Sequence, residues 1–133
     1  MKIETLLPSE QDYKFAQQIG QLIIAECPEV NHVFWFGSRS KGVGTNLSDF
    51  DICILVDKYY FSIGGVALLN SVKLKAEKKL IEAGFLIGKG PGEVDLGVLS
   101  DIVVEQYQDR SLGAILPSEV MKGLLVAQRN KHV

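Results

Sequence analysis

Apolar positions near the start of the chain recur at helical spacing, which predicts an amphipathic helix over residues 9–26. Ser9, with Asp12 three positions later, has the form of a capping box at the beginning of this helix, although Asp stands where Glu or Gln is usual. Cys27-Pro28 ends the helix, because the residue before a proline disfavours helical backbone angles. The apolar stripe indicates that the helix packs against a core.

Two short and predominantly apolar runs, residues 33–36 and 50–56, follow this helix. Apolar runs of this length, bounded by turn-forming residues, are typical of strands buried on both faces. The connection between them, residues 37–48, is rich in glycine and serine, which indicates a loop. We therefore expect two core strands to flank a polar loop.

A second amphipathic helix is predicted over residues 66–83, where apolar positions recur at helical spacing, lysines occupy the other faces, and Gly84 ends the pattern. Residues 85–87 and 94–99 then predict two strands. They are separated by residues 88–92, whose glycines and proline favour a turn. We therefore expect these two strands to form a hairpin.

The chain after Ser100 carries mixed signals, and its structure stays open at this point. Residues 102–104 are compatible with a strand, or with a helix that begins behind Ser100-Asp101, and Ser118-Glu119 is compatible with the cap of a last helix. The order helix, strand, strand, helix, strand, strand predicts an α/β or α+β fold. Its expected architecture is a small mixed β-sheet with helices packed on it.

The composition is that of a globular protein of one domain. Of 133 residues, 47% are hydrophobic and 23% are charged, which excludes disorder, collagen-like repeats and coiled coil. A single domain over residues 1–133 is expected, because domains are typically about 100–150 residues long. The formal net charge of -2 offers no basic field, so nucleic-acid binding is unsupported.

Cysteine use and hydropathy predict the compartment. Cys27 and Cys53 have no C-x-x-C spacing, and the first residues lack the charged and then apolar pattern of a secretory signal. No apolar stretch approaches the roughly 20 residues that cross a bilayer, so no membrane span is expected. These features favour a reduced, cytoplasmic protein.

Two aspartates at the head of the second predicted strand carry the clearest sign of chemistry. Asp49 and Asp51 are two residues apart, so both project from the same face of an extended chain. Like charges this close repel each other and are costly to desolvate, and a cation usually neutralises them. Carboxylate oxygens with open positions left for phosphate suit Mg²⁺. From this pair alone, a magnesium site and two solvent-exposed residues at a strand entrance are both open interpretations.

The glycine and serine that follow the first predicted strand suit the binding of a phosphate. Gly37-Ser38 stands where a glycine lets the backbone come close to an anion and where free N–H groups can collect around it. A Walker A loop is excluded, because Val43 and Gly44 occupy the positions that require Lys and then Ser or Thr after Gly42. A dinucleotide-binding fingerprint is excluded as well, because its third glycine is missing.

Together these motifs resemble the signature of the polymerase-β-like nucleotidyltransferase superfamily, in which Gly-Ser precedes an Asp-x-Asp in a hydrophobic strand. The closer form, Gly-Ser-Arg-Ala-Arg-Gly followed by Ser-Asp-x-Asp, resembles the minimal nucleotidyltransferases of bacteria and archaea. The chain has Gly-Ser-Arg-Ser-Lys-Gly at residues 37–42 and Ser-Asp-Phe-Asp at residues 48–51. Ser40 in place of Ala and Lys41 in place of Arg are its departures from that form.

The resemblance implies a third carboxylate between apolar residues on a later strand. Asp95, between Val94 and Leu96, meets this requirement. The alternative for Asp95 is an exposed position on an edge strand. The resemblance covers residues 30–100, and the polymerase-β-like fold that it implies agrees with the element order above.

By this resemblance, two Mg²⁺ ions lie between the carboxylates and the triphosphate of ATP or another nucleoside triphosphate. Asp49 and Asp51 would hold both ions, and Asp95 would hold one and help to deprotonate an acceptor hydroxyl. Paired metals can stabilise the attacking and the leaving oxygen of an in-line displacement. The implied reaction is attack on the α-phosphorus with release of pyrophosphate.

The resemblance also implies nucleotide-binding residues. Gly37 and Ser38 would hold the β- and γ-phosphates, and these two are favoured over the neighbouring cations. Arg39 or Lys41 would add positive charge against the triphosphate, or else face water, and Arg39 is included among the candidate nucleotide-binding residues. Residues 59–61, Tyr-Tyr-Phe, are expected to anchor a loop after the second strand, with stacking on a nucleobase as the alternative.

The function implied by the resemblance is the Mg²⁺-dependent transfer of a nucleoside monophosphate, AMP from ATP, to a hydroxyl of a protein or small molecule. Many minimal members are antitoxins that adenylylate a tyrosine on a helical HEPN-type toxin, so a HEPN-like partner is the favoured acceptor. Homo- or hetero-oligomers are compatible with this interpretation. Two alternatives stay open: a non-catalytic module that neutralises a partner by contact, and a subunit of an antibiotic-modifying nucleotidyltransferase.

Overall fold

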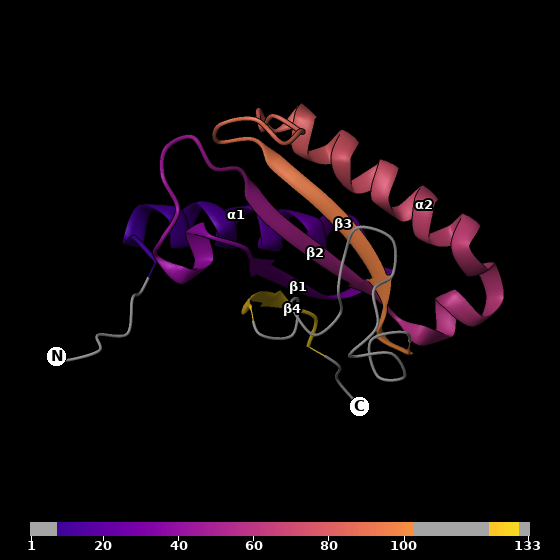
Figure 1. Cartoon of the computed structure of the whole chain (residues 1–133). Helices are drawn as coiled ribbons and strands as arrows, with labels where there is room; N and C mark the ends of the chain where they lie inside the picture. Colours follow the sequence, from indigo (N-terminus) through magenta and orange to yellow (C-terminus); the bar gives the residue numbers. More distant parts are fainter. Residues whose placement is uncertain (1–7, 103–122, 131–133) are drawn as a thin grey trace, which may run out of the picture.

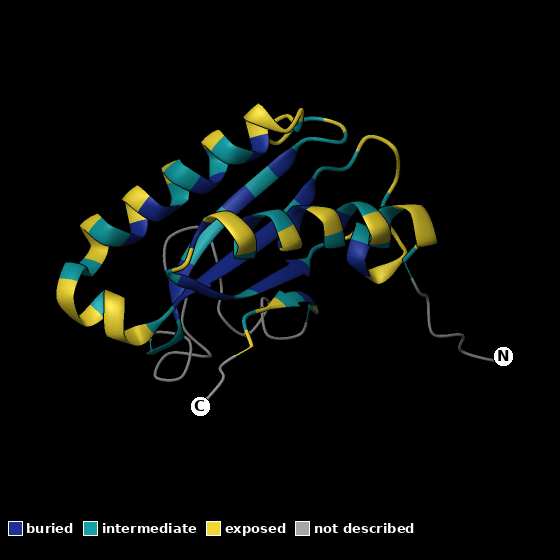
Figure 2. Cartoon of the chain, turned by 180° about the vertical axis from the view of Figure 1, so that it is seen from behind, coloured by how far each residue is buried: buried dark blue, intermediate teal, exposed yellow. Residues whose placement is uncertain are grey.

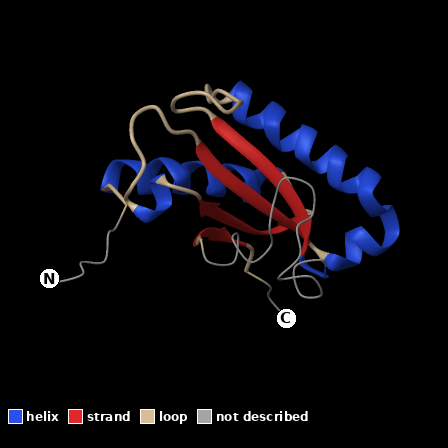
Figure 3. Ribbon diagram, viewed as in Figure 1, coloured by secondary structure: helices blue, strands red, loops and turns tan. Residues whose placement is uncertain are grey.

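The computed structural model describes residues 8–102 and 123–130 of the chain (Figure 1). Figure 3 shows its helices and strands. In chain order they are α1 (Glu10–Glu26), β1 (Val30–Phe36), the short 3-10 helix η1 (Arg39–Lys41), β2 (Phe50–Val56), α2 (Lys58–Glu82), β3 (Val94–Ser100) and β4 (Leu124–Gln128). Within the described part of the chain, no helix combines the length and the hydropathy that crossing a bilayer requires.

The strands form one four-stranded sheet in the order β3-β2-β1-β4. β1 pairs antiparallel with both β2 and β4, whereas β2 and β3 are parallel. Parallel neighbours need a crossover connection, and α2 supplies it between β2 and β3. This mixed sheet with packed helices confirms the predicted α/β (α+β) fold class.

The main hydrophobic core lies between the sheet and the two long helices. Figure 2, seen from behind, shows α1 in front of the strands and α2 along the side of β3. Alternate residues of the strands meet the inner faces of both helices, and burial of each large side chain contributes roughly 1.5–3 kcal/mol. The largest fully buried side chains of this core include Trp35, Ile19, Ile23, Ile52, Ile54 and Leu80.

The opposite face of the sheet carries a smaller apolar cluster. Phe34, Cys53, Leu55 and Leu99 are buried there, and Phe36 packs against them. Successive strand residues point to opposite faces, so the odd-numbered residues of β2 and β3 share this face, which lies opposite α1 and α2. A polar side chain at such a position therefore avoids the main core.

The beginning of α1 agrees with the sequence pattern. The Oγ of Ser9 accepts a hydrogen bond from the Asp12 N–H at 3.1 Å, so Ser9 is the N-cap that the motif predicts. At the other end, the cap backbone N–H of Cys27 donates to the Ile23 carbonyl. The predicted helix over residues 9–26 is confirmed within one residue.

α2 begins earlier than predicted, at Lys58, and includes residues 59–61, which were expected in a loop. The side chain of Asp57 caps it by accepting a hydrogen bond from the Tyr59 N–H at 2.8 Å. A kink with φ 62° and ψ −152° at Gly65 separates the first turns from the rest. Those first turns expose several apolar side chains, so no single apolar stripe marked them as helical.

The predicted hairpin between residues 85–87 and 94–99 is wrong. β3 forms, but its partner is β2 in parallel, and Ile87 makes only an isolated bridge to Val94. Phe85 instead packs into the main core, with its ring centroid 5.3 Å from that of Phe15. The apolar residues after α2 therefore close the end of that helix over the core and do not extend the sheet.

β4 was not foreseen, because the signals after Ser100 were mixed. It extends the sheet beside β1, and Arg129, just after it, donates from Nη2 to the carbonyls of Ile24 and Cys27 at 2.6 and 2.9 Å. The Ser118-Glu119 cap and most of the alternative for residues 102–104 lie outside the described residues.

Candidate active site

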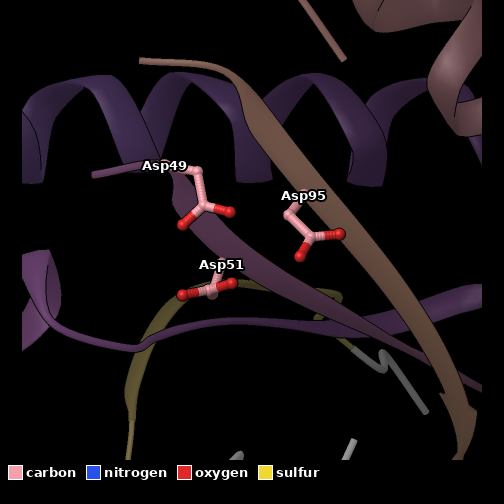
Figure 4. Close-up of side chains that lie close together, drawn as sticks. All are labelled: Asp49, Asp51 and Asp95. Carbon is pink, nitrogen blue, oxygen red and sulfur yellow. The ribbon is translucent and has the colours of Figure 1, made fainter. Parts of the chain in front are cut away.

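Three aspartates meet on the face of the sheet opposite α1 and α2. Asp49 immediately precedes β2, Asp51 is the second residue of β2, and Asp95 is the second residue of β3. One carboxylate oxygen from each lies within 4.8 Å of the others, and all three side chains are half-buried (Figure 4). The structure therefore brings together the three carboxylates that the sequence motifs singled out.

The strand register produces this convergence. Asp51 and Asp95 are direct partners in the parallel pairing of β2 with β3. The apolar pairs on either side of them, Phe50 with Val94 and Ile52 with Leu96, face the main core. Slipping one strand by a single residue would turn its aspartate into that core, so burial of the apolar pairs determines the position of the carboxylates.

The electrostatics of the cluster are unfavourable without a cation. Burial, and after it the charges of Asp49 and Asp95, raise the pKa of Asp51 to about 6. The pKa of Asp49 is raised too, first by burial and then by the charge of Asp95. Lys89, which the sequence analysis did not single out, opposes both of these pKa shifts with its positive charge. A divalent cation among the oxygens would remove the repulsion.

Gly37 lies at the end of β1, beside the carboxylate of Asp51. Its φ of 83° belongs to the left-handed region, which residues with a Cβ rarely adopt. A Cβ built there would also collide with the Asp51 carboxylate. Gly37 is therefore required by the packing of this carboxylate, in addition to any contact with a ligand.

The loop after Gly37 is closed by its own hydrogen bonds. The carbonyl of Ser38 accepts from the N–H groups of Lys41, Val43 and Gly44 at 3.1 Å each. The exposed Ser38 hydroxyl donates to the Oγ of Ser48 at 3.4 Å. Ser38 is therefore held near the segment that leads into Asp49, with its side chain accessible to solvent.

Arg39 is engaged on the other side of this loop. Its Nη1 lies 3.0 Å from the Asp12 carboxylate, its Nε donates to the Ser48 carbonyl at 3.0 Å, and the guanidinium stacks on the Phe50 ring. Only 11% of its side chain is exposed. Arg39 thus links α1 to the segment on either side of Asp49. Its contact with a triphosphate stays a prediction.

The raised pKa of Asp51 predicts a gain in stability for Asp51→Asn in metal-free protein. The pKa in the fold, about 6, exceeds the ordinary 3.8, so folding disfavours the carboxylate. The penalty is complete above the folded pKa and vanishes as the pH falls below the ordinary one. At about pH 8 we expect the free energy of unfolding to rise by about 1–2 kcal/mol, a value discounted because Asp51 is partly exposed.

Urea unfolding in a chelator at about pH 8 and about pH 4 measures this difference. The gain should disappear at the lower pH, and millimolar Mg²⁺ should stabilise the wild type but not Asp51→Asn. Equal stability at the higher pH, or a gain that persists at the lower one, would contradict the electrostatic account.

Comparisons with known proteins agree with this geometry. A family model described as "Nucleotidyltransferase domain" matches residues 21–112, a range that contains all three aspartates and the loop after Gly37. The fold is similar to that of a solved structure described as a putative nucleotidyltransferase from Sulfolobus solfataricus. That likeness has a TM-score of 0.52 and 20% sequence identity, and it covers 90% of this chain and 82% of the other. The comparison with curated proteins gave no match.

Proposed function

Because this chain belongs to the nucleotidyltransferase domain family, we propose that it transfers a nucleoside monophosphate, AMP from ATP, to a hydroxyl group and releases pyrophosphate. The observation that carries this proposal is the convergence of Asp49, Asp51 and Asp95, all of them partly exposed, on the face of the sheet opposite α1 and α2. The three oxygens come from two segments of chain, the start of β2 and the start of β3, and the register of these parallel strands holds them together. Such an arrangement is suited to a charged substrate and its cations.

The donor set fits Mg²⁺. Carboxylate oxygens are its preferred protein ligands, and burial together with mutual repulsion raises the pKa of Asp49 and Asp51, a penalty that a bound cation would relieve. Asp49, Asp51 and Asp95 are therefore the residues that would hold the two ions implied by the family. When bound, the ions would neutralise phosphate charge and stabilise the attacking and leaving oxygens.

The remaining roles fall to residues of the chain itself. Asp95 would accept the proton of the acceptor hydroxyl on its carboxylate. Gly37 keeps a side chain away from the carboxylates, and the exposed Ser38 hydroxyl is available to the terminal phosphates. These residues would contribute to catalysis mainly by holding the acceptor oxygen next to the α-phosphate, because phosphoryl transfer depends on positioning and charge stabilisation.

We also propose that the chain is a cytoplasmic, single-domain minimal nucleotidyltransferase, with a HEPN-like protein as acceptor and partner. The motif at residues 37–42 supports this assignment. Its departure at Ser40 is compatible with the loop, because the buried Ser40 hydroxyl donates to the Gly37 carbonyl at 2.7 Å. An antitoxin role follows from that class of partner.

Label transfer tests the proposed reaction. The chain is incubated with α-labelled ATP, Mg²⁺ and the product of the adjacent gene, with a chelator as the control. We expect label on a hydroxyl of the partner and release of pyrophosphate, both lost in the chelator. Absence of transfer, together with no calorimetric signal for millimolar ATP and Mg²⁺, would contradict the proposal and favour a non-catalytic binding module.

A further inference from the structure

The turn at residues 88–92, Gly-Lys-Gly-Pro-Gly, is attached to both segments that carry the aspartates. The Gly92 N–H donates to the Ser48 carbonyl at 3.1 Å, beside Asp49. The N–H of Phe50, between Asp49 and Asp51, donates to the Glu93 carbonyl at 2.8 Å. The turn then leads directly into β3 and Asp95. Its position relative to the carboxylates is therefore set by backbone hydrogen bonds.

The side chain of Glu93 is used inside this turn. Its carboxylate accepts a hydrogen bond from the Gly90 N–H at 3.0 Å. The same carboxylate occupies the space that a Cβ at Gly88 or at Gly90 would need. The turn is thus wrapped around Glu93, and Lys89 at its tip is left as an exposed cation.

Lys89 interacts with the aspartates of the site through its charge, without a direct ion pair. The turn that carries it is hydrogen-bonded to Ser48, beside Asp49, and its charge opposes the rise in the pKa of Asp49 and Asp51, so the ammonium lies within electrostatic reach of the cluster. No carboxylate among the described residues forms an ion pair with it. Arg39 affects the pKa of Asp49 but not that of Asp51, and its guanidinium is already paired with Asp12. Lys89 is accordingly a cation near the site whose N–H groups can donate hydrogen bonds to a ligand.

We propose that Lys89 binds the triphosphate of the nucleotide substrate and that the turn at residues 88–92 is a second phosphate-binding element beside Gly37-Ser38. This inference rests on the proposed function. Three carboxylates and a triphosphate together carry more negative charge than two divalent ions neutralise, so the loaded site still attracts a cation. A lysine supplies a compact charge on a flexible stem, which suits phosphate oxygens near a solvent-exposed turn.

Substitution of Lys89 tests this role. Calorimetry in Mg²⁺ compares the wild type with Lys89→Met and Lys89→Arg, using a non-hydrolysable ATP analogue and AMP as ligands. Lys78→Met is the matched control, because Lys78 is an exposed lysine of α2 whose charge shifts the pKa of neither Asp49 nor Asp51. For Lys89→Met we expect affinity for the triphosphate analogue to fall by about tenfold, with little change for AMP. Lys89→Arg should recover most of the affinity.

The outcomes separate this inference from the proposed function. If the wild type does not bind the analogue, the proposed function fails and the inference fails with it. If the wild type binds and Lys89→Met binds the analogue as tightly, the inference is overturned while the proposed function stands. An equal loss of affinity for the analogue and for AMP would also overturn it, because a ligand of the terminal phosphates must distinguish the two.

Discussion

Asp51→Asn is expected to lower the rate of nucleotidyl transfer on the order of 1000-fold while the protein remains folded. Asp51 is close to both other carboxylates of the site, since it lies two residues after Asp49 and pairs directly with Asp95. An amide in its place removes a negative charge and one strong oxygen ligand from the proposed Mg²⁺ site. The loss should appear in kcat as well as in the apparent affinity for Mg²⁺.

Label transfer at saturating ATP, measured over a range of Mg²⁺ concentrations, checks this expectation. Asp101→Asn is the matched control, because Asp101 is a half-buried aspartate just after the opposite end of β3, with a hydrogen bond from Asn31 at 3.2 Å. The control should retain its transfer rate within a few-fold. The same Asp51→Asn protein should unfold at a higher urea concentration in chelator. Loss of activity together with a gain in stability would show that the repulsion among the three aspartates serves the function and not the fold. Undiminished transfer by Asp51→Asn would refute the proposed site.

Gly37→Ala is expected to be the second most damaging change, with transfer reduced by at least about 100-fold and stability lowered by about 1–2 kcal/mol. Two effects add up at this position. The φ of 83° disfavours any side chain, and the new methyl group would displace the Asp51 carboxylate from its place. The carboxylate would have to leave the cluster, so affinity for Mg²⁺ should fall together with the transfer rate.

Gly65→Ala separates the two effects. Gly65 also has a positive φ, of 62°, but a Cβ there would meet no atom within 4 Å. This control should lose a similar amount of stability by urea unfolding and keep its Mg²⁺ affinity and transfer rate. If both variants lose transfer equally, backbone strain alone explains the effect, and the placement of Asp51 by Gly37 would be refuted.

Local sequence patterns predicted those helices and strands whose capping residues and apolar spacing lie within the element itself. The capping motif at Ser9 and the apolar stripe behind it defined α1, and the apolar run of β2 was correct to the residue. The kinked start of α2 was missed, since its exposed tyrosines and its two glycines break the helical pattern. The hairpin prediction failed because an apolar strand pattern does not encode the direction of its partner.

Around the candidate site too, contacts between residues far apart in the sequence were not predicted. Arg39 and Asp12 are separated by 27 positions, so their ion pair was invisible while Asp12 was considered only as a capping residue. Lys89 was overlooked for a similar reason, because its glycine-rich turn signalled a change of chain direction and no more. The backbone hydrogen bonds that join Gly92 to Ser48, and Glu93 to Phe50, are what show that this turn lies beside the aspartates.

By itself, the sequence determined that Asp49 and Asp51 face the same way, because the period of a strand is two residues wherever the strand lies. It also supplied Asp95 in an apolar context and the small residues of the Gly37-Ser38 loop. The tertiary structure decided that Asp95 stands beside Asp51, because this depends on the parallel register of β2 and β3, which burial of apolar side chains against α1 and α2 selects. It likewise decided that Gly37 must lack a side chain, since the group that excludes one comes from a neighbouring strand.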